Sequence, residues 1–158
     1  MRPDPFPTAS PVCGPDGLQD GERLLLWMLR QWVAARILRE DPRARLAAFA
    51  GPYVSPRGAA AFVLLMTAIE ARVRRPLCVA PPRCQGYALD EQRIVTACGI
   101  GPRAPEIAAQ LLGPLVAGSQ VVANLARILN TTFAREGLSL PVRLEDRQSA
   151  PIPRPTLH

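Results

Sequence analysis

The chain has 158 residues, 48% of them hydrophobic, and a formal net charge of +6. This is enough apolar sequence for one ordinary domain with a buried core, and no run reaches the roughly 18 charge-free apolar residues of a membrane span. Because all nineteen basic residues are arginine and the one histidine is His158 at the end, the chain lacks a Walker lysine, a Cys-His pair, a Ser-His-Asp set and an HExxH motif.

The two ends of the chain are rich in proline. Residues 1–12 hold four prolines and no periodic apolar pattern, so we expect a disordered tail. The segment lacks the apolar core of a signal peptide, and we therefore expect a cytoplasmic protein. Residues 140–158 have a similar composition, and we expect a flexible C-terminal tail there.

The first long helix is expected to begin at Asp20, which can cap its free N–H groups. Leu24 and Trp27 fall on the side opposite the main apolar stripe, so this helix should pack on two faces. There Trp27 could also reach a partner. The main stripe follows helical spacing and consists of Leu25, Leu26, Leu29, Trp32, Val33 and Ile37.

Two further helices follow in the first half. Asp41-Pro42 and Ser55-Pro56 each place a capping residue before a proline at the first helical position, which is a helix start signal. The short helix should contain Leu46 and Phe49. The next one, 57–74, is apolar nearly all round and is expected to be central and buried.

The second half shows a similar order of elements. Asp90 should cap a brief helix, and Pro105 should begin a small one that ends near Leu112. The last helix is expected over Ser119–Glu136, with Gly137 as its C-cap. Its apolar stripe is Val121, Val122, Leu125, Ile128, Leu129 and Phe133.

The chain repeats part of its own sequence. Residues 13–25 and 84–95 each contain a cysteine in a turn, then an aspartate, an arginine and an aliphatic pair, and Gly-Pro precedes an apolar run at Gly51 and again at Gly113. A repeat decides the fold prediction. We expect an all-α fold of about six helices in one domain, 13–139, built from two similar three-helix halves, 13–77 and 78–139.

The cysteines are the main candidates for chemistry. Cys13 and Cys84 occupy equivalent turns, and Cys78 lies close before the second one. These three could form a zinc site, although their spacing is looser than in a zinc knuckle; packed free thiols and a redox or disulfide pair are the alternatives. Cys98 lies on an apolar helix face, where a buried thiol is common.

Charged residues gather at helix ends. Asp20, Glu22, Asp90 and Glu91 could act as paired carboxylates or could cap two helices, and we favour capping. The cluster of Arg72, Arg74 and Arg75 suits a helix C-terminus or, alternatively, a phosphate. A polar helix face that could contact nucleic acid is formed by Gln120, Asn124, Arg127 and Arg135.

The chain resembles a family of short helical bacterial proteins of unknown function over about residues 12–140. The resemblance is carried by Cys13, Cys84, the stretch 75–82 and the motif 89–91. It implies the helical repeat but no activity.

The function that we expect is therefore that of a small, soluble, non-enzymatic interaction protein without a cofactor, which binds a protein partner or a second copy of itself. A cysteine-based metal or redox module and an arginine-dependent nucleic-acid binder are the alternatives. No membrane partner is expected.

Overall fold

A computed structural model describes residues 14–143 of the chain. The expected disorder of 1–12, and of the tail beyond 143, lies outside these residues. The described part is all-α, as predicted, and its only extended pairing is an isolated bridge between Val73 and Val116. The helices are α1 (Asp20–Leu38), α2 (Pro42–Ala50), α3 (Pro56–Arg72), α4 (Leu89–Ile100), α5 (Pro105–Leu112) and α6 (Ser119–Arg135).

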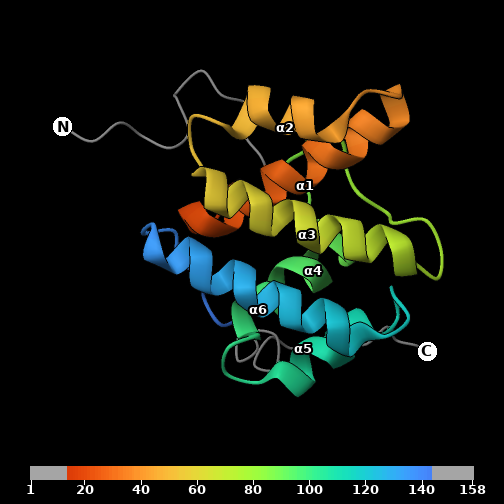
Figure 1. Cartoon of the computed structure of the whole chain (residues 1–158), viewed down its shortest axis with the longest axis vertical. Coiled ribbons are helices and arrows are strands. Elements are labelled where there is room, and N and C mark those ends of the chain that lie inside the picture. The colour runs from red at the N-terminus through yellow and green to blue at the C-terminus, as the bar shows by residue number, and fades with distance from the viewer. Residues whose placement is uncertain (1–13, 144–158) are drawn as a thin grey trace, which may run out of the picture.

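The helices pack in two layers (Figure 1). Helices α3 and α6 lie side by side and form the front layer in this view, with α1 and α4 behind them. Helix α2 packs on α1 at one end of the molecule, and α5 packs on α4 and α6 at the other end. No helix within residues 14–143 combines the length and the apolar character needed to cross a bilayer.

Two helix starts follow the predicted capping chemistry. The Asp41 carboxylate accepts a hydrogen bond from the Arg43 N–H at 3.0 Å, with Pro42 at the first helical position. The Ser55 hydroxyl accepts one from the Gly58 N–H at 3.1 Å and precedes Pro56 in the same way. Each cap satisfies an amide that has no partner inside the helix.

The predicted caps of α1 and α4 are wrong by one or two residues. The capping positions are Gln19 and Ala88, not Asp20 and Asp90. In both helices the glutamate three positions further on reaches back to the N–H of the capping residue, Glu22 to Gln19 at 2.9 Å and Glu91 to Ala88 at 2.8 Å. The glutamates therefore supply the backward bond of a capping box.

The most enclosed helices are α1 and α4, not α3. Every residue in the ranges 24–32 and 94–100 is buried, because these helices are covered on more than one side. The expectation that α3 is buried all round is wrong: it lies in the outer layer, and Leu64 is 56% exposed. Three members of the predicted apolar stripes of α1 and α6 are also exposed: Ile37, Val121 and Ile128.

The folded part extends past residue 139, where the sequence predicted a flexible tail to begin. Leu138 and Leu140 are buried. The backbone of this segment passes so close to α1 and α4 that a Cβ at Gly21 or Gly99 would overlap a carbonyl oxygen of the segment. Apolar burial and close backbone approach therefore hold it against the helices.

In both halves the second of the three helices is the shortest. They differ in packing, since α5 lies extensively on α6 whereas α2 touches α3 over a small area. The superposition of the two halves remains a prediction.

We predict that Leu65→Ala lowers the free energy of unfolding by about 2–5 kcal/mol, because Leu65 is 1% exposed and its truncation leaves a cavity. The matched control is Leu64→Ala on the same helix, where we expect a loss below about 1 kcal/mol. Chemical denaturation measures both. Equal losses would contradict the assignment of the buried face of α3.

Candidate functional site

A buried ion pair joins α1 to the start of α4. Arg30 lies in the apolar middle of α1, and its side chain and that of Glu91 are both fully buried. Its Nε donates to Glu91 Oε2 at 2.7 Å and its Nη2 to Oε1 at 2.9 Å. This is the bidentate geometry in which a guanidinium binds a carboxylate most strongly.

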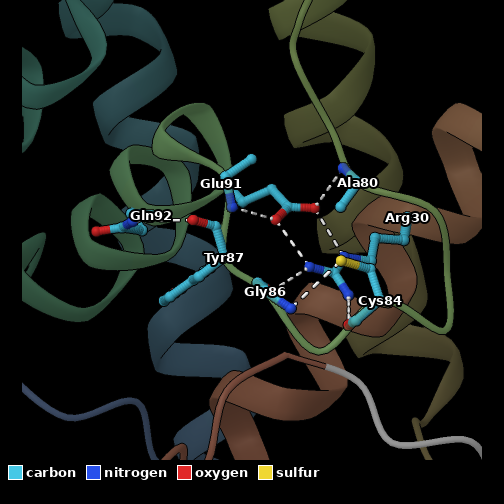
Figure 2. A network of polar contacts seen from close by, with 8 residues as sticks. Arg30, Ala80, Cys84, Gly86, Tyr87, Glu91 and Gln92 are labelled. Atoms are coloured by element: carbon cyan, nitrogen blue, oxygen red, sulfur yellow. Dashed lines mark hydrogen bonds and ion pairs between the residues drawn. The ribbon is translucent and has the colours of Figure 1, made fainter.

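The pair also holds the loop that precedes α4 (Figure 2). The Arg30 guanidinium donates to the carbonyl oxygens of Cys84 at 2.6 Å and Gly86 at 2.8 Å. Glu91 accepts from the Ala80 N–H at 3.0 Å as well as from that of Ala88. A buried charge is costly unless its hydrogen-bonding capacity is met, and here the loop backbone meets much of it.

A second ion pair fixes the beginning of this connection. Asp90 accepts two hydrogen bonds from Arg75, at 2.8 and 2.9 Å, and one from the Cys78 N–H at 2.7 Å. The hydrogen bonds from Arg75 lower the pKa of Asp90 against the opposing effect of its burial. Asp90 is therefore an ionised anchor rather than the helix cap that the sequence suggested.

The three cysteines of the predicted metal site are only partly described. Cys13 lies outside residues 14–143, so the zinc site with Cys78 and Cys84 remains a prediction. Cys78 is exposed and Cys84 is half-buried, and both are free thiols. The Gly14 N–H donates to the Cys84 carbonyl oxygen at 3.0 Å, which brings the backbone of the two repeated turns together. Over residues 14–143, no group of three or more potential metal ligands is present.

Cys98 lies in the core, as predicted. Its side chain is fully buried in α4, and burial raises the pKa of its thiol to about 12. A thiol with such a pKa stays protonated and unreactive at neutral pH.

We call the Arg30–Glu91 pair and its hydrogen bonds to the loop backbone the clamp. The loop that it holds forms one wall of a groove of about 700 Å³. The opposite wall comes from α1, from α2 and from the turn that follows α2. The lining residues are Trp27, Gln31, Arg45, Ala48, Phe49, Pro52, Tyr53, Pro81, Pro82 and Arg83. Aromatic rings on the helical wall and prolines on both walls give this groove the mostly apolar lining that is typical of a ligand-binding surface.

An ordered aromatic pair lies in this groove. Phe49 is 45% exposed. The Arg45 guanidinium lies 5.0 Å from the centre of its ring. The rings of Trp27 and Phe49 pack edge to face, with their centres 6.5 Å apart. Trp27 itself is only 9% exposed and packs beside Leu26. Trp27 still lines the groove, so its contact with a partner remains a prediction, and Phe49 is the more exposed ring of the pair.

Two arginines give the groove positive charge. The Arg45 guanidinium donates to Gln31 at 2.7 Å and pairs with Glu40 at 2.7 Å, so its charge is partly neutralised. Arg83 is exposed and forms no ion pair with any residue in the range 14–143.

A second pocket of about 310 Å³ continues the groove along α1. It shares Arg45, Pro81 and Pro82 with the first pocket and adds the exposed apolar side chains of Ile37 and Leu38. The two pockets therefore form one extended apolar track on either side of the Pro81-Pro82 pair.

The arginine cluster after α3 turns toward the protein. Arg74 Nε donates to the Gly113 carbonyl oxygen at 2.8 Å, and Arg75 binds Asp90. Arg72 lies in the last turn of α3, where the helix-end interpretation expects it, whereas Arg74 and Arg75 bind other parts of the chain. The predicted polar face of α6 is solvent-exposed.

Sequence reasoning missed both the clamp and the groove. One signal for the clamp was present: the neighbours of Arg30 three and four positions away on its helix are all apolar, so a buried arginine needed a distant acid. The groove had no such signal, because its walls come from segments about 30 residues apart and more.

Comparison of the chain with protein-family models, curated proteins and solved structures gives no match. The resemblance to short helical bacterial proteins therefore remains a prediction, and the inferences below depend on the geometry alone.

We predict that Arg30→Met and Glu91→Gln each lower the free energy of unfolding by about 3–5 kcal/mol, because each leaves a buried charge without its partner. The double variant should lose clearly less than the sum, which is the signature of a direct interaction. Chemical denaturation of all four proteins gives the coupling energy.

The control is Arg36→Met, which removes the pair between Arg36 and Glu70, where 54% and 32% of the two side chains are exposed. A loss below about 1 kcal/mol is expected there. Additive losses for the Arg30 and Glu91 variants would contradict the clamp.

Proposed function

We propose that this protein is a non-enzymatic interaction module that binds an extended, proline-containing peptide segment of a protein partner. The observation that carries the proposal is the groove between the aromatic wall on α1 and α2 and the wall formed by residues 81–83, with its paired prolines. Grooves lined by aromatic side chains bind proline-rich segments because such segments are already extended and lose little entropy on binding.

The aromatic surface is suited to binding because it is partly preorganised. Trp27 and Arg45 pack against Phe49 from two sides, so its ring is held in place before a ligand arrives. Held aromatic side chains are common energetic hot spots at protein interfaces. Binding to a side chain that is already held costs less conformational entropy than binding to one that must first be ordered.

The chemistry of the lining supports binding rather than catalysis. Among the described residues that line the groove, none is a carboxylate, a thiol or a histidine. Arg83 offers an exposed guanidinium that can pair with an acidic residue of the bound segment.

We include a cytoplasmic location in the proposal. The thiols of Cys78, Cys84 and Cys98 are free, which suits a reducing compartment.

We predict that selection from a display library of 12-residue peptides against the full chain enriches proline-containing sequences with an acidic residue. Their affinity should fall about tenfold or more in Phe49→Ala, the loss expected when a hot-spot aromatic residue is truncated. Fluorescence anisotropy with a labelled selected peptide measures this change.

The matched control is Ile128→Ala on α6, because Ile128 is 46% exposed and Phe49 is 45% exposed. It should leave the affinity unchanged, and thermal melts should show that both variants are folded. Selected peptides that bind wild type and Phe49→Ala equally would overturn the proposal.

A further inference from the structure

We propose that the groove is occupied in cis by the protein's own N-terminal segment, residues 3–12, which an external partner must displace. This inference rests on the proposed function of the groove and names the segment that competes for it. It is argued from where the described chain begins, from the length and composition of the segment, and from the sign of the charge in the groove.

The described chain begins beside the groove. The Gly14 N–H donates to the Cys84 carbonyl oxygen at 3.0 Å, and Arg83, which lines the groove, directly precedes Cys84. The Arg30 guanidinium donates to the same Cys84 carbonyl oxygen. The clamp thus fixes the point from which the N-terminal segment departs, next to one wall of the groove.

The segment can extend well beyond the point from which it departs. Ten residues in an extended polyproline conformation span about 30 Å at ~3.1 Å per residue. The tether also raises the local concentration of the segment to about the millimolar range. Even weak intrinsic affinity for the groove would then give substantial occupancy.

The composition of the segment matches the surface. Prolines recur along it, and Phe6 lies between Pro5 and Pro7. Such a stretch offers apolar rings to the aromatic and proline side chains of the two walls.

Charge separates this segment from the other proline-rich end of the chain. Among its prolines, over residues 3–12, the N-terminal segment carries only the acidic Asp4, with Arg2 just before them, whereas the prolines of 151–155 flank the basic Arg154, with Glu145 and Asp146 further before them. Asp4 can pair with Arg83, the exposed arginine of the groove, whereas Arg154 would be repelled by it. We therefore commit to the N-terminal segment.

The test uses full-length chains and a fluorescently labelled synthetic peptide of residues 1–12. A released chain carries four serines in the N-terminal segment: Pro3→Ser, Pro5→Ser, Phe6→Ser and Pro7→Ser. Its matched control carries four at the other end: Pro151→Ser, Ile152→Ser, Pro153→Ser and Pro155→Ser. Neither set touches residues 14–143.

The peptide should bind the released chain about tenfold or more tightly than it binds wild type or the control chain, because only the released chain has an unoccupied groove. Adding Phe49→Ala to the released chain should remove this gain. Light scattering after size exclusion should show wild type and the released chain as monomers.

Three results would overturn the inference. Equal, Phe49-dependent binding to all chains would show a binding groove that the chain's own segment does not occupy. If the 1–12 peptide bound no chain while library-selected peptides still bound through Phe49, the groove would again be one that the N-terminal segment does not occupy. In both cases the proposed function stands. A wild-type dimer that dissociates in the released chain would place the segment in the groove of a second copy. Only if selected peptides fail as well does the proposed function fall.

Discussion

The buried pair between Arg30 and Glu91 is the interaction on which the arrangement of this protein depends. It joins the middle of α1 to the start of α4, so it connects the two halves of the chain at their most enclosed helices. The same two side chains also bind the backbone of the loop 80–88. Removing one partner of such a pair is costly because it leaves the other charge buried, and here the pair also fixes the course of a loop.

The groove follows from this constraint. Pro81, Pro82 and Arg83 have no helix of their own, and they become a wall because the residues on either side, Ala80 and Cys84, are bound by the clamp. The other wall is built on α1 and α2, which pack closely on each other. A wall held by charge-assisted hydrogen bonds and a wall held by helix packing together give a surface that is largely formed before a ligand binds.

Local signals in the sequence were sufficient to predict the helices but not their depth. Caps and prolines at Asp41-Pro42 and Ser55-Pro56 marked helix starts because they act within one turn. The burial of α3 was predicted wrongly because apolar residues all round a helix do not say which neighbours cover it, and α6 covers one side only. The role of Asp90 was also misread, since its partner Arg75 lies 15 positions earlier in the chain. The groove could not be predicted at all, because Trp27, Phe49 and Pro81 meet only in the folded chain.

Amide hydrogen exchange of Arg30→Met tests the central claim most directly, because it reports separately on the loop and on the helices. The account predicts that the amides of residues 80–88, including Ala80 and Ala88, lose nearly all of their protection in this variant. The amides of α6 should lose only what the global loss of about 3–5 kcal/mol requires and should remain protected. If residues 80–88 stayed protected, or if they and α6 remained protected to the same degree, the claim that this pair holds the wall of the groove would be contradicted.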